Sequence, residues 1–299
     1  MNSLPFLLLC PSAAKSSALC ASFVLGLFSS AAFADSLVLS NGQTLTAKAF
    51  RREGEVIVAT AETPGPDGKM MIVERKTPLT EISKVECSLP PVLQSAQAQF
   101  AVGKAATVLN DILAAVKAAE PFGELPGSFW PDLIVLQAHG LLALGKDVEA
   151  AALVSSFEKT TYAALAADAK AIRAVIAARA GDHSTALSLA TTLLKDSTRP
   201  STIAAASLAH GLCLLAKKEH AAALKAFLEL PVFTPDEQAL STAAQFGAAQ
   251  AYWGLEDHDR AIATLEDLIK TRPSSPEAPK AQTLLPAWKK RRTALADAK

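Results

Sequence analysis

Three segments of this chain share one pattern: an acidic residue, a histidine, two variable residues, an alanine and then Leu or Ile. They begin at Asp182, Glu219 and Asp257. The histidines that follow are 37 and then 38 residues apart, a period that is typical of stacked helix pairs. The sequence therefore predicts a repeat protein. Such a protein offers an extended surface that binds a partner, and little enclosed volume for catalysis.

Small and large residues recur within each unit as two crossing helices require. In the clearest unit, Gly211 and Ala223 are small, Phe227 is aromatic and Pro235 closes the unit. This pattern resembles the tetratricopeptide repeat family. The resemblance implies a mainly α fold, a right-handed α-solenoid of helix hairpins. The repeats are expected at 131–164, 167–200, 204–237 and 242–275.

The first 34 residues predict a signal peptide. Lys15 precedes an apolar run rich in small residues, which ends in Ala32-Phe33-Ala34, the small-x-small pattern that signal peptidase accepts. The run is too short and too rich in Ser and Ala for a membrane span. We expect cleavage after Ala34, an exported protein that is periplasmic or secreted, and no integral membrane segment after cleavage.

Cleavage would leave two cysteines, Cys87 and Cys213. In an oxidising compartment they could form a disulfide. Alternatively they are two separate buried thiols, because Cys87 ends a β region and Cys213 lies on the first helix of a repeat. The sequence favours separate thiols.

Residues 35–88 alternate apolar and polar side chains, which predicts strands with one buried face. Asn41-Gly42 separates two such runs and predicts a hairpin turn, since both residues can take positive φ. About five strands are expected, and their number and spacing resemble a small SH3-like or Sm-like β-barrel. The region lacks aromatic stacking platforms for RNA, so we interpret it as a structural or protein-docking module.

Prolines mark the boundary between the two parts of the chain. Residues 89–91, Leu89-Pro90-Pro91, predict a semi-rigid linker. The helical region then extends over 92–299, with capping helices before the first repeat and after the last.

The charge balance argues against a nucleic-acid partner. Lys and Arg number 29, as do Asp and Glu, so the formal net charge is +0. The attraction that supplies most non-specific nucleic-acid binding is therefore missing. One basic run, Lys289 to Arg292, is interpreted as the solvated face of a terminal helix in preference to an anion or membrane-surface site.

The repeated acid–histidine pairs raise the question of a metal site or a proton relay. Metal ligands converge on one point, whereas these histidines occupy equivalent positions of successive repeats, about 10 Å apart on helix-packing spacings. Their acidic neighbours stand where a second helix begins and complement its exposed N–H groups. We expect a structural ladder, with no metal and no cofactor.

Catalytic motifs were not found either. The stretch from Gly65 to Met70 has some likeness to a phosphate loop, but it lacks the length, the Ser or Thr and the following helix. We interpret it as a surface hairpin loop, and we expect that the protein is not an enzyme.

The family resemblance also implies where a partner would bind. In that family the first helices of the repeats line a concave groove, and corresponding positions point inward. We predict an apolar or amphipathic segment in this groove, with Trp253 and Phe246 as anchors. The alternative is that both aromatic side chains fill space beside the terminal helix. The groove candidates are His139, Arg179, Leu212, Phe246, Gln250 and Trp253.

These features favour a non-catalytic exported adaptor or scaffold for protein–protein interactions at the bacterial cell envelope. Residues 272–281 resemble the Pro- and Ser-containing pattern that joins repeats in periplasmic Tol-Pal-associated and outer-membrane-assembly members of the family. The resemblance implies envelope proteins as partners. The alternative is an enzyme, or an accessory subunit of one, that acts on peptidoglycan or polysaccharide with the repeats as a platform.

Overall fold

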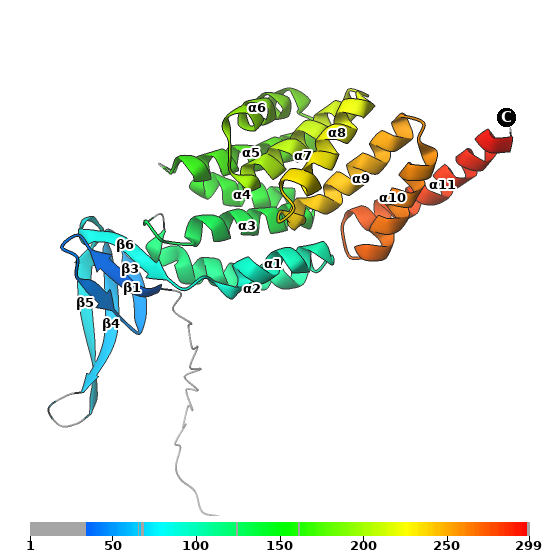
Figure 1. Cartoon of the computed structure of the whole chain (residues 1–299). Helices are drawn as coiled ribbons and strands as arrows, with labels where there is room; N and C mark the ends of the chain where they lie inside the picture. Colours follow the sequence, from blue (N-terminus) through cyan, green and yellow to red (C-terminus); the bar gives the residue numbers. More distant parts are fainter. Residues whose placement is uncertain (1–33, 65, 67–68, 124, 161, 298–299) are drawn as a thin grey trace, which may run out of the picture. The chain divides into compact units, whose positions relative to one another are not determined.

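The computed structural model describes residues 34–64, 66, 69–123, 125–160 and 162–297. These residues form a small β module followed by consecutive packed helices (Figure 1). The predicted mainly α fold with an N-terminal β module is thus confirmed. The predicted signal peptide, residues 1–34, lies outside the described residues except for Ala34 and stays a prediction. None of the described helices combines the length and the apolar character needed to cross a membrane.

The β module consists of two antiparallel three-stranded sheets, ordered β2-β1-β6 and β3-β4-β5. The described strands are β1 Ala34–Leu39, β2 Thr44–Thr46, β3 Ala49–Glu53, β4 Val56–Pro64, β5 Met70–Pro78 and β6 Ile82–Cys87. One strand more than expected is present, because most side chains of β3 are exposed and show no apolar alternation. Cross-strand ion pairs contribute there, with Arg51 Nη1 2.7 Å from Glu74 Oε1.

The hairpin predicted at Asn41-Gly42 joins β1 and β2, but its turn differs from the prediction. Gly42 has a φ of +84°, whereas Asn41 is not among the residues with positive φ. Instead, the Asn41 side chain accepts a hydrogen bond of 3.0 Å from the Gln43 backbone N–H. The Leu39 N–H donates to the Gln43 carbonyl at 2.8 Å, so residues 40–42 lie inside the loop, which is longer than a two-residue turn. The Asn41 side chain stabilises it by bonding the backbone two residues on. The predicted hairpin loop around Pro66 does connect β4 to β5.

The core of the β module includes residues from beyond the linker. Leu37, Ile57 and Val85 are buried together with Phe122, which belongs to a short 3₁₀ helix, Glu120–Phe122. The Val85 backbone N–H also donates to the Pro126 carbonyl at 2.7 Å. Because burial of an aromatic ring contributes strongly to a small core, the β module is completed by the segment that follows the second helix.

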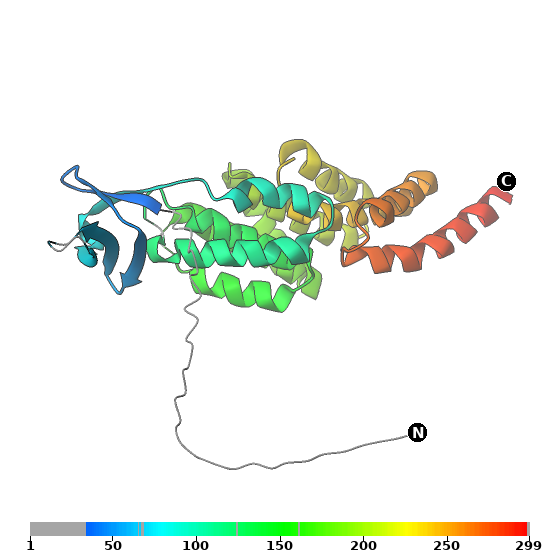
Figure 2. The same cartoon turned by 90° about the horizontal axis from the view of Figure 1, so that it is seen from below.

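The helical region contains eleven described α-helices, of which α3 to α10 form four consecutive packed pairs. α1 and α2 lie beside α3, as the views in Figures 1 and 2 agree. Their bounds are α1 Pro91–Ala101, α2 Ala105–Ala119, α3 Trp130–Ala143, α4 Asp147–Phe157, α5 Ala163–Ala180, α6 His183–Asp196, α7 Pro200–Ala216, α8 His220–Phe233, α9 Gln238–Gly254, α10 His258–Thr271 and α11 Glu277–Asp297.

The acidic residues of the repeated motif stand at helix N-termini, as predicted. The Asp182 side chain accepts from the Thr185 N–H at 3.1 Å, and the Asp257 side chain accepts from the Arg260 N–H at 3.3 Å. Glu219 occupies the same position before α8 but makes no such bond. Two of the three acids therefore cap a helix by a hydrogen bond. No group of metal-ligating side chains was found among the described residues.

Glycines at two helix crossings explain how the repeats pack closely. Phe227 is 1% exposed and lies between Gly211 of α7 and Gly247 of α9. A Cβ at Gly247 would lie 2.4 Å from the Phe227 Cζ atom, so the ring fits only against a residue without a side chain.

The first helices of the four pairs are α3, α5, α7 and α9, and the first of them also contacts the last. α3 packs on α5 and also on α9, while α7 packs on both α5 and α9. Residues from all four helices belong to one buried cluster, among them Val135, Ile172, Leu208 and Leu240. The inward positions that a repeat protein can leave open are thus largely filled by its own side chains.

The two cysteines are not joined by a disulfide. Cys213 is buried in α7, and burial raises the pKa of its thiol. Cys87 is half-buried at the end of β6. The separate-thiol interpretation therefore holds, although only Cys213 is fully buried.

Candidate protein-binding cleft

The contact between α3 and α9 covers one predicted groove residue. His139 is 1% exposed, and its Nδ1 atom lies 3.3 Å from Glu237 Oε2. His139 is therefore covered by α9 and does not lie on the open groove surface predicted for it; it lines a small cavity instead. The sequence offsets placed it correctly on the inward side of α3, but they carried no information about the distant helix that covers it.

Three further candidates are engaged within the fold. Arg179 donates from Nη1 to the Leu142 carbonyl at 2.9 Å and to Asp147 Oδ1 at 2.7 Å, which ties α5 to the preceding turn. Leu212 is half-buried against the main core. Phe246 packs against a smaller cluster formed by α9, α10 and α11. These contacts favour the space-filling interpretation of Phe246.

Gln250 and Trp253, the remaining candidates, line one cleft of about 910 Å³. The cleft is formed by the α7–α8 turn, the end of α9, the start of α10 and the C-terminal half of α11. Its volume lies within the range of about 300–1,000 Å³ that is usual for binding pockets. The other lining residues are Leu215, Lys218, His220, Gly254, Glu256, His258, Trp288, Arg291 and Leu295.

Stacked aromatic rings form the most apolar part of this cleft. The rings of Trp253 and Trp288 are 4.4 Å apart between centroids, with an angle of 10° between their planes. The His258 ring lies 4.3 Å from Trp253 on a tilted plane. Such half-buried aromatic surfaces are strong anchors in protein interfaces. The sequence analysis missed Trp288, although its position in the helix after the last repeat could have indicated it.

The turns inside the four helix pairs share a left-handed residue at one equivalent position. It is glycine in the first two pairs, with φ of +69° at Gly145 and +89° at Gly181. In the next two pairs it is Lys218, with φ of +62°, and Glu256, with φ of +64°. These are the only non-glycine residues with positive φ among those described, and both line the cleft. Because this conformation costs about 1–2 kcal/mol for a residue with a Cβ, their side chains are placed in the cleft at the expense of stability.

The histidines of the repeated motif lie at the first position of α6, α8 and α10. In His183, His220 and His258 the Nδ1 atom is buried and has no hydrogen-bond partner among the described residues. Their fixed positions in successive repeats agree with the structural ladder predicted from the sequence. His220 and His258 also form part of the cleft wall.

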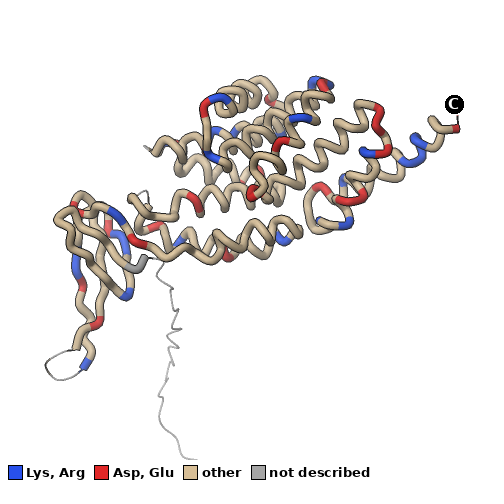
Figure 3. Tube along the Cα trace, in the orientation of Figure 1, with Lys and Arg blue, Asp and Glu red and all other residues tan. Residues whose placement is uncertain are grey.

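The charges around the cleft are mixed. Lys289 and Arg292 of the predicted basic run pair with acidic residues of α10, at 2.6 Å from Glu266 and 2.9 Å from Asp259; Figure 3 shows this run on α11. Arg291, in contrast, lines the cleft. The solvated-face interpretation holds for the paired cations, while Arg291 provides a positive group beside the aromatic rings.

Comparisons with known proteins agree with the helical pairs. A family model described as tetratricopeptide repeat matches residues 243–275. This stretch covers most of α9 and all of α10, the pair that contributes Gln250 and Trp253 to the cleft. A search of curated proteins found no match.

Proposed function

The chain is a tetratricopeptide repeat protein, and on this premise we propose that it is an exported, non-catalytic adaptor of the cell envelope. Tetratricopeptide repeats suggest a protein–protein interaction scaffold. We place the bound segment of the partner in the cleft of Trp253 and Trp288, and not along the inward face of the first helices, where His139 and Arg179 are already engaged.

The observation that carries this proposal is the pair of left-handed residues at the cleft. Lys218 and Glu256 take a conformation that earlier repeats assign to glycine. A glycine at either position would relieve the steric cost. Residues held in a sparsely populated backbone conformation cluster at functional sites, and both line the cleft, so these two side chains are candidates for direct contact with a partner.

The lining also indicates the chemistry of the bound segment. Two indole rings and Leu215 favour apolar side chains of the partner. Lys218 and Arg291 outnumber Glu256, so the cleft favours a segment with at least one acidic residue. We therefore propose an amphipathic, mildly acidic segment of an envelope protein.

Site-specific photo-crosslinking tests this function. A photoreactive amino acid at Gln250 is placed in the cleft, and one at Lys270 of α10, an exposed residue outside the cleft, serves as the matched control. In envelope fractions the Gln250 probe is expected to crosslink one defined protein, and the Lys270 probe is not. Retention of peptidoglycan or polysaccharide fragments with no crosslinked protein would refute the adaptor and favour the alternative of a glycan-acting enzyme or accessory subunit.

A further inference from the structure

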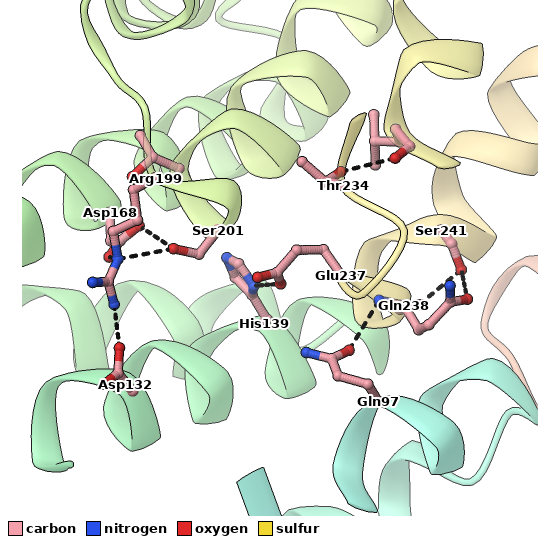
Figure 4. A network of polar contacts seen from close by, with 12 residues as sticks. Gln97, Asp132, His139, Asp168, Arg199, Ser201, Thr234, Glu237, Gln238 and Ser241 are labelled. Atoms are coloured by element: carbon pink, nitrogen blue, oxygen red, sulfur yellow. Dashed lines mark hydrogen bonds and ion pairs between the residues drawn. The ribbon is translucent and has the colours of Figure 1, made fainter. Parts of the chain in front are cut away.

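A second, smaller cavity of about 260 Å³ lies among α1, α3, the start of α7 and the residue before α9. Figure 4 shows the polar network around it. None of its residues lines the cleft proposed for the partner. Part of its wall is apolar and consists of Leu93, Val135, Leu136 and Pro200. The polar lining consists of Gln97, Asp132, His139, Arg199, Ser201 and Glu237.

One side of the network is held by an ion pair, although Asp168 Oδ2 makes no hydrogen bond among the described residues. Asp168 is buried and accepts hydrogen bonds from Ser201 Oγ at 2.8 Å and Thr202 Oγ1 at 2.6 Å. Its other oxygen lies 2.7 Å from Arg199 Nε. The same guanidinium donates to Asp132 Oδ1 at 2.5 Å. The Arg199 side chain thus pairs with two carboxylates. Of the two, the Asp168 side chain is fully buried, whereas the Asp132 side chain is 46% exposed.

The other side of the network is incomplete. His139 Nδ1 and Glu237 Oε2 are 3.3 Å apart without hydrogen-bond geometry. The second ring nitrogen, Nε2, is buried and has no partner among the described residues; in Figure 4 it points to the side where Ser201 lies. Buried polar atoms are nearly always hydrogen-bonded in folded proteins. His139 Nε2 and Glu237 Oε2 are therefore both available to hydrogen-bond a ligand in the cavity.

Charge decides which kind of group is needed. Asp132, Asp168 and Glu237 carry three negative charges, and Arg199 is the only Lys or Arg paired with any of them among the described residues. The excess is negative whether His139 is neutral or protonated. Asp168 is paired with Arg199, and the Asp132 side chain is 46% exposed, so the uncompensated buried charge is that of Glu237. Because such a charge is costly, the cavity favours a cation and disfavours an anion.

We propose that this cavity binds an alkylammonium group. An ammonium has three N–H donors and no acceptor, which suits the two atoms without a hydrogen-bond partner, Glu237 Oε2 and His139 Nε2, while Asp132 adds a negative charge to the lining. Leu93 and Val135 would contact the apolar stem. The cavity is smaller than the range of about 300–1,000 Å³ that holds drug-sized ligands, so it accommodates one short chain. The source is either a free small amine or a lysine side chain.

The test measures binding of n-butylammonium to the full-length chain. Isothermal titration calorimetry and ligand-observed NMR, both at low salt, give the affinity. Saturable millimolar binding of n-butylammonium is expected, with neither 1-butanol nor butyrate binding. Glu237→Gln is expected to weaken the affinity by at least about tenfold, since it removes a buried charged partner. Glu149→Gln, at an exposed carboxylate of α4, is the matched control and should leave the affinity unchanged.

A second variant tests the site without removing a buried side chain, in case Glu237→Gln does not fold. Asp132 is 46% exposed at its side chain, so Asp132→Asn is expected to fold and to weaken binding as well. Absence of saturable binding, or equal affinity of n-butylammonium for wild type and both variants, would overturn the proposal. Tighter binding of Nα-acetyl-lysine methylamide than of n-butylammonium would support the site with a lysine side chain as its ligand. The reverse order would support it with a free amine.

Discussion

The packing of Phe227 between two glycines allows a quantitative test of how the repeats fit together. We consider Gly247→Ala, which adds one methyl group to α9. Its Cβ would lie 2.4 Å from Phe227 Cζ and 2.6 Å from Cε2. The ring cannot retreat towards α7, because a Cβ placed at Gly211 would also be only 2.6 Å from Phe227 Cε1. The added methyl therefore overpacks the junction between the third and fourth pairs.

Two opposing effects set the magnitude. Alanine is favoured over glycine in a helix by about 1 kcal/mol, while inserting a methyl group into a packed core costs about 1–3 kcal/mol. Because the ring is confined on both sides, we take the upper part of that range and expect a net loss of about 1–2 kcal/mol. For a chain of this size this corresponds to a decrease of about 2–8 °C in Tm.

Thermal and urea unfolding, followed by circular dichroism, measure this loss. Gly140→Ala is the matched control: its Cβ would meet Leu109 Cδ1 at 3.2 Å and Phe100 Cζ at 3.3 Å, contacts that need only a small shift, so the helix preference of about 1 kcal/mol should leave it close to neutral. In a Phe227→Leu background the cost of Gly247→Ala should become smaller, as expected for residues in direct contact. If Gly247→Ala instead stabilised the protein by about 1 kcal/mol, the helix preference alone would be acting and the packing argument would be refuted.

Three further predictions concern helix ends and buried charge. Asp257→Ala should lower the free energy of unfolding by about 1 kcal/mol through loss of the cap, whereas Glu219→Ala, which removes no cap bond, should change it by less than about 0.5 kcal/mol; urea titration compares the two. Hydrogen bonds from Thr185 lower the pKa of Asp182, so its stabilising contribution is present above the unfolded pKa of about 4 and is lost as the pH falls further; a constant difference in Tm between wild type and Asp182→Ala from pH 7 to pH 2 would contradict this. Burial raises the pKa of Glu277, so ionisation destabilises the fold as the pH rises above about 4; Glu277→Gln should raise Tm at pH 7, and the gain should vanish in acid.

The repeats could be predicted because their signals are local. The period of the histidines, the small residues at Gly211 and Ala223 and the acids at helix starts all lie within single units of the chain. Each follows from the packing of two neighbouring helices, which the sequence of one unit determines. The match of the tetratricopeptide repeat model to 243–275 falls on the unit expected at 242–275.

The covering of the inward face could not be predicted, because it depends on contacts between distant segments. The Gln238 N–H donates to Gln97 Oε1 at 2.9 Å, and Arg272 Nε donates to the Ala101 carbonyl at 3.1 Å. No periodicity links such residues. The packing of α9 on α3 likewise covers His139, which the family offsets alone would leave in a groove.

Two parts of the cleft were missed for different reasons. Trp288 lies outside the repeats, so the offsets of the family could not reach it. The left-handed turns at Lys218 and Glu256 carry side chains that give no sign of positive φ. The sequence could have indicated them only by comparing the position with the glycines that occupy it in the first two pairs.

The proposed function depends on binding of the partner in the cleft of Trp253 and Trp288, with Lys218 and Glu256 at its edge. The most direct test is the affinity of the protein crosslinked at Gln250, measured by calorimetry for wild type, Lys218→Gly and Glu256→Gly. Each glycine variant is expected to be at least as stable as wild type, since it relieves about 1 kcal/mol of strain, and to bind the partner at least about tenfold more weakly. Unchanged affinity in both stably folded variants would contradict the claim.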